Sequence, residues 1–239
     1  MPPLALTGER TLPDVPAENY WFRRHLAVYE WVAERCAGLD VVDMACGEGY
    51  GVDVLARRAR SVTGVDANPE AFEHARAKYA RPGVAFAREL VQTFEQPCDA
   101  LVFLQTIEHV EQPAEVLRHF RRLLRRGGAA YVSTPNLLTL APEGAEKSDN
   151  PWHLREYRAE EFRSLCESAF EHVELVGLFH ARKLRVHELA LRAGWDRLHK
   201  ALGITERFYG WFTPAISARD FALREAPLGR ALDFVAVLR

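Results

Sequence analysis

Three glycines alternate with other residues directly after a short apolar run, at Gly47, Gly49 and Gly51. Residues 41–42 are both valine and lead into Asp43, which is typical of a buried strand that ends at a tight turn. Glycine lets a backbone take positive φ or approach a ligand closely, and the first N–H groups of the helix that follows are unpaired. The pattern therefore predicts a ligand-binding turn.

Two cofactor classes use such a turn. A nicotinamide dinucleotide fingerprint has a further glycine three residues after its second, but Val52 occupies that position, and we recognise no Tyr/Lys or similar hydride-transfer constellation. We therefore disfavour a pyridine-nucleotide oxidoreductase. The spacing GxGxG, with Asp43 four residues before Gly47, resembles motif I of the class I S-adenosylmethionine (SAM)-dependent methyltransferases.

A second carboxylate follows at the end of the next predicted strand. Residues 61–66, SVTGVD, end in Asp66, and Asn68 and Pro69 are typical of a helix N-cap and first turn. In a mononucleotide-binding fold, an acidic residue at this strand tip accepts hydrogen bonds from the ribose hydroxyls. We expect Asp66 to do so.

The next part of the chain alternates strands and helices. Residues 98–105 predict a short buried strand, and a helix is expected from about Pro113 to Arg126. Gly127 and Gly128 then break the pattern before a strand over residues 129–136. Such alternation predicts a parallel, doubly wound sheet.

The ordered set over residues 40–136 resembles the class I SAM methyltransferases near the ubiquinone-biosynthesis O-methyltransferases and sugar-modifying enzymes. The resemblance implies an α/β, Rossmann-like, mostly parallel sheet of seven strands in the order 3-2-1-4-5-7-6. It also implies SAM as cofactor and S-adenosylhomocysteine as product.

Two positions depart from the family pattern. Arg126 stands where proline is usual before the glycines, which affects only a turn. Gln105 stands where metal-using quinone-type relatives carry an acidic residue three before the Glu-His pair. Without that ligand Glu108 and His109 make a poor divalent site, so we predict no required metal.

We expect the cofactor to lie along the carboxyl ends of the first strands. Asp43 and the backbone at Gly47 and Gly49 would hold its methionine end, and Glu89 and Leu90 its adenine side. The full expected set is Asp43, Ala45, Gly47, Gly49, Asp66, Ala67, Glu89, Leu90 and Gln105.

Methyl transfer from a sulfonium is an in-line displacement, so the protein mainly positions the acceptor and removes its proton. His109 follows the fourth strand, and His153 lies in the long loop of residues 137–157. Histidine titrates near neutral pH, so both are candidate bases. We favour His109, although either side chain fits a structural role.

Four segments are expected. They are an N-terminal arm and helix (1–36), a SAM-binding core (37–180), a helical cap (181–222) and a final core strand (223–239). Roughly fifty residues between the last two strands far exceed a hairpin loop. A segment that covers the sheet edge or forms a dimer contact is the alternative to a cap.

Composition favours a soluble protein with small-molecule partners. The 239 residues are 48% hydrophobic and 27% charged, with a net charge of −2 that gives no general attraction to nucleic acid or membrane. The four cysteines are scattered and expected to be reduced, and no segment approaches a membrane-spanning length. We expect a cytoplasmic monomer or homodimer.

The acceptor is left open by the sequence. A hydroxyl of a sugar, phenol or natural-product intermediate is the favoured small-molecule acceptor. N-methylation of a small amine and a non-catalytic SAM-binding protein are the alternatives.

Overall fold

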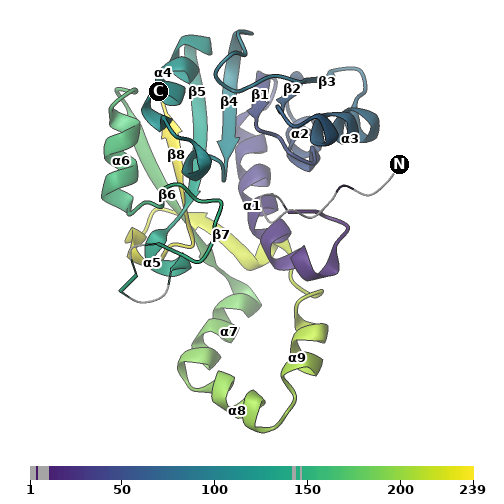
Figure 1. The fold of residues 1–239 in the computed structure, drawn as a ribbon, viewed down its shortest axis with the longest axis vertical. Helices are drawn as coiled ribbons and strands as arrows, with labels where there is room; N and C mark the ends of the chain where they lie inside the picture. The colour runs from purple at the N-terminus through teal and green to yellow at the C-terminus, as the bar shows by residue number, and fades with distance from the viewer. Residues whose placement is uncertain (1–3, 5–10, 142–143, 146) are drawn as a thin grey trace.

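The computed structural model describes residue 4 and residues 11–141, 144–145 and 147–239. An eight-stranded sheet runs through the molecule in the order β3-β2-β1-β4-β5-β8-β6-β7 (Figure 1). The strands are β1 (Asp40–Met44), β2 (Ser61–Val65), β3 (Val84–Ala87), β4 (Cys98–Leu104), β5 (Leu124–Pro135), β6 (Val173–His180), β7 (Phe221–Arg224) and β8 (Asp233–Leu238).

The predicted fold class is confirmed, with one strand more than expected. Strands β1 to β5 pair in parallel, and β8 pairs antiparallel with both β5 and β6. This reproduces the predicted order, with the last strand between the fifth and sixth. The eighth strand, β7, pairs antiparallel with β6 at the sheet edge. It has only four residues, too few for an alternating pattern to show in the sequence.

Helices cover both faces of the sheet (Figure 1). Residues of α1 and α2 belong to one buried cluster, and residues of α4 and α6 belong to the other. The helices are α1 (Asn19–Arg35), α2 (Tyr50–Leu55), α3 (Pro69–Tyr79), α4 (Pro113–Leu123), α5 (Leu137–Leu140), α6 (Ala159–Glu167), α7 (Arg182–Arg192), α8 (Trp195–Ala201) and α9 (Thr205–Phe212), with 3₁₀ turns η1 (Pro16–Glu18), η2 (Ile107–His109), η3 (Ala218–Asp220) and η4 (Leu228–Arg230).

The central strands alternate between the two clusters. Val41 packs with the α1 side, and Val42 and Met44 pack with the α4 side. Because successive side chains of a strand point to opposite faces, both faces of β1 are buried and apolar. This fixes the register of β1 between β2 and β4, and it brings the turns after β1, β2 and β4 to one edge of the sheet.

Helices α7 to α9 form a lobe that projects from the sheet edge between β6 and β7 (Figure 1). Its interior is aromatic: the ring of His187 lies 4.7 Å from Phe212 and 5.8 Å from Phe208, centroid to centroid. The residues predicted to form a cap are therefore largely helical. Within the described part of the chain, no helix is long and apolar enough to cross a membrane.

Candidate active site

The three glycines of the turn after β1 have different roles. Gly47 has φ of 55° and faces open space, because an added Cβ would have no atom within 4 Å apart from its neighbours in the chain. Gly49 has φ of 95°, and an added Cβ would lie 2.8 Å from the Cβ of Ala75 on α3. At Gly51 a Cβ would lie 2.2 Å from the ring of Tyr29 on α1. Only Gly47 therefore leaves room for a ligand, and the other two glycines allow close packing.

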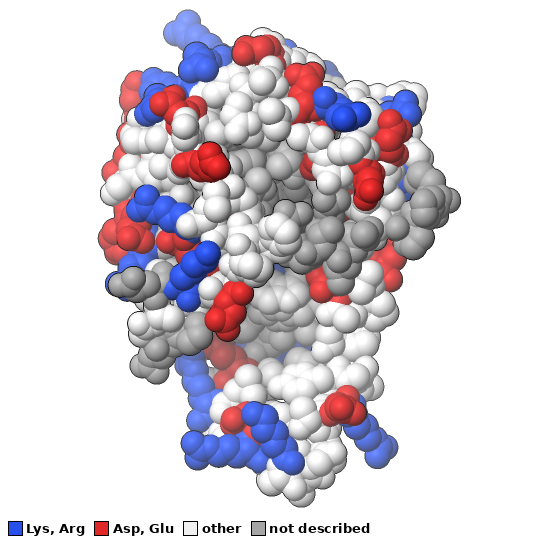
Figure 2. All heavy atoms as spheres, in the orientation of Figure 1, with Lys and Arg blue, Asp and Glu red and all other residues white. Residues whose placement is uncertain are grey.

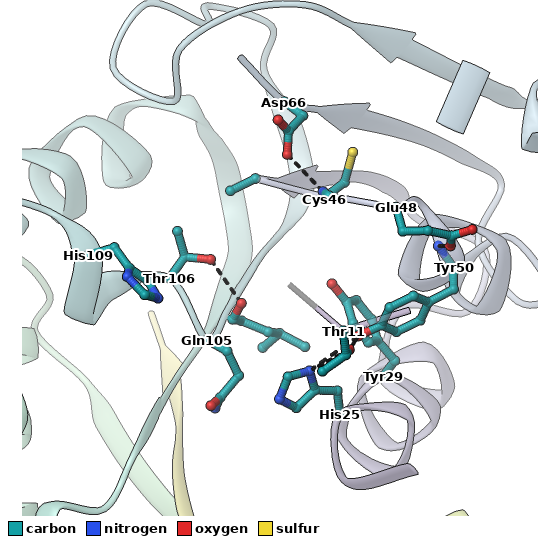
Figure 3. Close-up of a pocket in the computed structure, with 13 residues that line it drawn as sticks. Thr11, His25, Tyr29, Cys46, Glu48, Tyr50, Asp66, Gln105, Thr106 and His109 are labelled. Atoms are coloured by element: carbon teal, nitrogen blue, oxygen red, sulfur yellow. Dashed lines mark hydrogen bonds between the residues drawn. The ribbon is translucent and has the colours of Figure 1, made fainter. Parts of the chain in front are cut away.

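A cavity of about 230 Å³ lies over this turn (Figure 3). Five of the residues expected at the site line it: Ala45, Gly47, Asp66, Gln105 and His109. They come from the ends of β1, β2 and β4, which is the edge where open α/β sheets bind ligands. The structure thus brings these five together.

Asp66 joins the second strand to the glycine turn. Its Oδ2 accepts a hydrogen bond from the backbone N–H of Gly47 at 2.8 Å (Figure 3). Its Oδ1 accepts one from the backbone N–H of Asn68 at 2.9 Å. The side chain of Asn68 in turn caps α3. The carboxylate therefore holds the backbone that surrounds the cavity, and it lines the cavity itself.

Other expected residues lie outside the cavity lining. Asp43 is fully buried beneath the turn, where the hydroxyl of Tyr29 donates to its carboxylate at 3.3 Å. Burial raises the pKa of Asp43 well above its ordinary value. Gly49 faces α3, and Ala67, Glu89 and Leu90 are exposed. Contact of these five residues with the cofactor stays a prediction.

Several further polar residues that were not expected line the cavity, and three of them contact one another. The Thr11 hydroxyl lies 3.2 Å from the Tyr50 hydroxyl, which lies 3.3 Å from Nδ1 of His25 (Figure 3). Desolvation lowers the pKa of His25 to about 4, so its ring is neutral at pH 7. The one signal in the sequence was the position of Tyr50 inside the glycine motif; Thr11 and His25 are brought there by the arm and by α1.

A second cavity, of about 690 Å³, adjoins the first. Thr11, His25, Gln105 and His109 line both. Its own lining adds Glu18, Trp21, Glu108, Pro135, Leu140, Ala141, Ser148, Asp149, Asn150 and His153. No lysine or arginine occurs among these described lining residues, so the described walls combine polar, acidic and apolar groups without a fixed positive charge.

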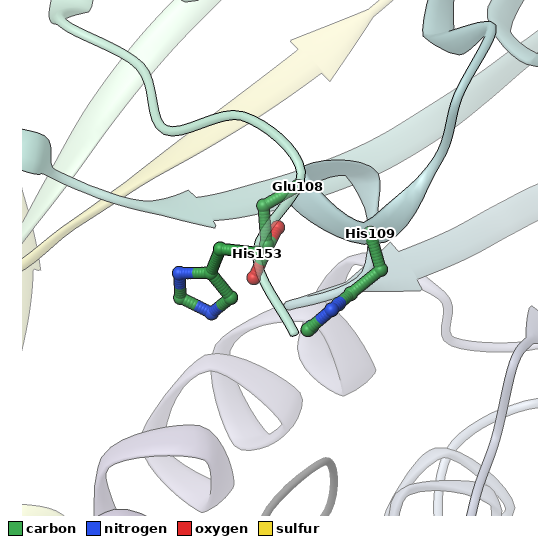
Figure 4. A group of neighbouring side chains, drawn as sticks. All are labelled: Glu108, His109 and His153. Atoms are coloured by element: carbon green, nitrogen blue, oxygen red, sulfur yellow. The ribbon is translucent and has the colours of Figure 1, made fainter. Parts of the chain in front are cut away.

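The two predicted bases meet at this second cavity (Figure 4). His109 is on η2 and His153 is in the loop before α6, and their ring centroids lie 5.0 Å apart. The Nδ1 of His109 lies 2.9 Å from the Trp152 carbonyl oxygen. Because a carbonyl only accepts, this contact places a proton on Nδ1 and makes Nε2 the basic nitrogen.

His153 has a different environment. Its Nδ1 lies 2.6 Å from Oε1 of Glu156, and both side chains are buried. The backbone N–H of Ser148 donates to the other oxygen of Glu156 at 2.8 Å, and Asn150 Nδ2 donates to Nε2 of His153 at 3.0 Å. Both ring nitrogens of His153 are therefore engaged by its own loop. No pattern in the sequence marks Glu156 as the partner of His153.

Glu108 is buried between these two histidines (Figure 4). The Thr134 hydroxyl donates to its Oε2 at 3.1 Å, and burial raises its pKa to about 8. One ligand atom each from Glu108, His109 and His153 lie within 4.8 Å of one another. A metal ion there would have to displace Asn150 from His153, and the expectation that no metal is required stays a prediction.

Comparison with known proteins identifies the family. The family model described as a methyltransferase domain matches residues 42–132, from β1 into β5. A probable S-adenosylmethionine-dependent methyltransferase of Mycolicibacterium smegmatis is 44% identical over 246 residues, covering 98% of this chain and 94% of the relative. The chain belongs to the S-adenosylmethionine-dependent methyltransferases. SAM is therefore the cofactor of this methyltransferase, as the glycine turn predicted.

Other relatives agree with this family assignment. A probable S-adenosylmethionine-dependent methyltransferase of Mycobacterium tuberculosis H37Rv is 45% identical over 185 residues, 76% of this chain and 67% of the relative. A ubiquinone biosynthesis O-methyltransferase of Pseudomonas aeruginosa PAO1 is 34% identical over 114 residues, covering 44% of this methyltransferase and 49% of that relative.

Solved structures share the fold at low identity. A SAM-dependent methyltransferase of Thermotoga maritima, described as a possible histamine N-methyltransferase, has a TM-score of 0.61 at 17% identity, covering 93% of each chain. The [4+2]-cyclase SpnF has a TM-score of 0.55 at 20% identity, covering 89% of this chain and 80% of its own. Because the same fold carries different reactions, these similarities establish only the fold of this methyltransferase. The acceptor has to be inferred from the residues of the site.

Proposed function

We propose that this enzyme transfers the methyl group of SAM to a hydroxyl of a small, neutral acceptor, with a sugar favoured over a phenol or another natural-product intermediate. The observation that carries the proposal is the second cavity. Its described walls offer amide, hydroxyl, imidazole and carboxyl groups without a lysine or arginine. Such walls make hydrogen bonds to hydroxyls and give an anionic acceptor no counter-charge.

The position of Trp21 supports a sugar-like acceptor. Its side chain lines the second cavity and keeps 39% of its surface exposed. An indole face provides an apolar surface against which the C–H groups of a sugar ring can pack, while polar groups such as Asn150 and Gln105 remain for its hydroxyls. A wholly apolar acceptor would leave these polar walls without hydrogen bonds.

We place the cofactor in the first cavity. Its amino-acid end would lie over Gly47, where the backbone leaves open space, and its ribose would lie at Asp66. The methyl group would then face the second cavity, because Gln105 and His109 line both. In-line transfer requires this meeting of the two cavities.

We assign His109 as the general base and His153 as a positioning residue. His109 lines both cavities, and its contact with the Trp152 carbonyl oxygen places its proton on Nδ1, so that Nε2 would take the proton of the acceptor hydroxyl. His153 lines only the second cavity and is engaged by Glu156 and Asn150. Its ring lies against His109 and limits the orientation of that base.

The test is formation of S-adenosylhomocysteine with a panel of neutral sugars, sugar phosphates, phenols and small amines. We expect turnover with a neutral sugar, and turnover confined to acidic acceptors would contradict the proposal. The His109→Gln variant should lose turnover and keep SAM affinity by calorimetry. If no acceptor in the panel reacts while SAM binds, the non-catalytic alternative gains support.

N-methylation of a small amine is the second candidate, and a specific observation favours it. Glu18 and Asp149 both line the second cavity, and carboxylates bind cationic amines. A variant separates the two candidates: an amine acceptor would bind more weakly after Asp149→Asn, because the change removes a carboxylate that lines the second cavity. A neutral sugar should tolerate the same change.

A further inference from the structure

A separate cavity of about 730 Å³ lies where the α7–α9 lobe joins the sheet. Its walls come from α7, the end of β6, the end of β7 and the connection between β7 and β8. Thr139 of α5 lines this cavity, whereas its neighbour Leu140 lines the second cavity, which we call the acceptor cavity because we propose that the acceptor binds there. Helix α5 therefore stands between the two.

Four arginines line this cavity, which we call the arginine groove: Arg185, Arg192, Arg224 and Arg230. The one carboxylate among its described lining residues is Glu188, which pairs with Arg192. Within the described part of the chain, the other three arginines have no ion-pair partner. The groove thus carries an uncompensated positive charge.

The overall composition of the chain does not explain the positive charge of the groove. The chain has a net charge of −2, so positive charge is not in excess overall, and several arginines elsewhere pair with acids. Arg60 and Arg125 both pair with Asp40 and Asp99 at the opposite end of the sheet. In Figure 2 blue atoms gather along the α7 side of the lower lobe. The groove therefore gathers four arginines into one cavity of a chain that has no overall excess of positive charge.

The groove is built to hold a guanidinium in a fixed place. The guanidinium of Arg224 lies over the ring of Phe179 at 4.5 Å from the centroid, and Phe179 is buried. Leu232 and Pro227 add apolar walls. A cleft with apolar walls focuses the field of its charges, and stacking on an aromatic ring reduces the side-chain entropy that an arginine loses when it binds.

We propose that the arginine groove is a binding site for a phosphoryl group. Guanidinium donates two parallel hydrogen bonds to phosphate oxygens, and three unpaired guanidiniums from α7, β7 and η4 supply more charge than a carboxylate ligand requires. The phosphoryl group belongs either to a dissolved phosphorylated molecule or to a lipid head group. The site is distinct from the acceptor cavity and does not depend on which acceptor is methylated.

The test compares the double variant Arg185→Gln/Arg224→Gln with the wild-type protein. Binding of inorganic phosphate and pyrophosphate is measured by calorimetry, and sedimentation with vesicles of phosphatidylglycerol or phosphatidylcholine tests the lipid source. The matched control is Arg207→Gln, because Arg207 is an exposed arginine of α9 that lines none of the cavities described above. SAM affinity reports whether each variant is folded.

We expect the double variant to bind pyrophosphate at least about tenfold more weakly, with Arg207→Gln and SAM affinity unchanged. If binding requires phosphatidylglycerol vesicles and is lost in the double variant, the site is a head-group site. Equal binding by the wild type and the double variant would overturn the proposal. So would an equal loss in Arg207→Gln, or the absence of binding to every probe.

Discussion

The buried carboxyl group of Glu108 makes the stability of this protein depend on pH. Its side chain is 1% exposed and contacts the hydroxyl of Thr134, and nothing cationic pairs with it in the described residues. Burial is the main cause that raises its pKa to about 8, and the nearby charges of Asp233 and Glu156 raise the pKa further. The folded protein therefore keeps this group protonated at neutral pH.

The direction of the effect follows from proton binding. Between the ordinary pKa of 4.5 and about 8, the folded state holds a proton that the unfolded chain has released. Folding is then opposed as pH rises, so the free energy of unfolding falls through this window. The difference is 8 − 4.5 = 3.5 pKa units, and at 1.36 kcal/mol per unit the full effect is about 5 kcal/mol.

The perturbation is Glu108→Gln, which keeps the shape of the side chain and cannot ionise. We expect the variant to resemble wild type near pH 4.5 and to become more stable than wild type as pH rises toward 8. The difference should reach a few kcal/mol, with about 5 kcal/mol as the upper bound. Urea unfolding at pH 5, 6, 7 and 8 measures it directly.

The matched control is Glu115→Gln. Glu115 is an exposed carboxylate that pairs with Arg118 on the surface of α4, so its loss should change stability by well under about 1 kcal/mol at each pH. Parallel curves for wild type and Glu108→Gln from pH 5 to pH 8 would refute the reasoning. They would mean that Glu108 is ionised in the folded protein and that a cation or water satisfies it.

Three further predictions concern the site itself. Asp66→Ala should weaken SAM binding in calorimetry by about 1.5–3 kcal/mol, and an unchanged affinity would remove Asp66 from the cofactor site. Gly47→Val should abolish SAM binding while circular dichroism shows a folded protein, because the side chain enters the cavity at φ of 55°; normal binding would contradict the placement of SAM. His109→Ala should lower turnover by about 10²–10⁴-fold with SAM affinity nearly unchanged, and a larger loss in His153→Ala would move the base to the loop.

The sequence predicted the sheet because its signals are local. Residues 41–42 and the strand that begins at Cys98 are apolar runs bounded by turns, and Asn68 and Pro69 mark the start of α3. Each feature is decided within a few residues. Strand β7 could not be predicted from such local signals, because it pairs with β6 only after the chain has passed through the whole α7–α9 lobe.

Part of the lining of the first cavity could be predicted for the same reason. Gly47 and Asp66 belong to a motif whose spacing reflects a fixed local geometry. By contrast, the cluster of Thr11, His25 and Tyr50 joins an arm, a helix and a turn. A contact between segments that are not adjacent in the sheet leaves no periodic signal in one sequence, so these residues could be found only in the folded chain.

The second cavity is bounded by η2 and by the loop before α6, two segments that lie far apart in the chain. The backbone N–H of Leu154 donates to the carbonyl oxygen of Glu108 at 2.9 Å, and the Trp152 carbonyl oxygen lies 2.9 Å from Nδ1 of His109. The buried pair of His153 and Glu156 closes the same segment on itself. Since these contacts run to η2 and not to the glycine turn, changes in this loop can alter the second cavity, where we propose that the acceptor binds, while the glycine turn keeps its geometry.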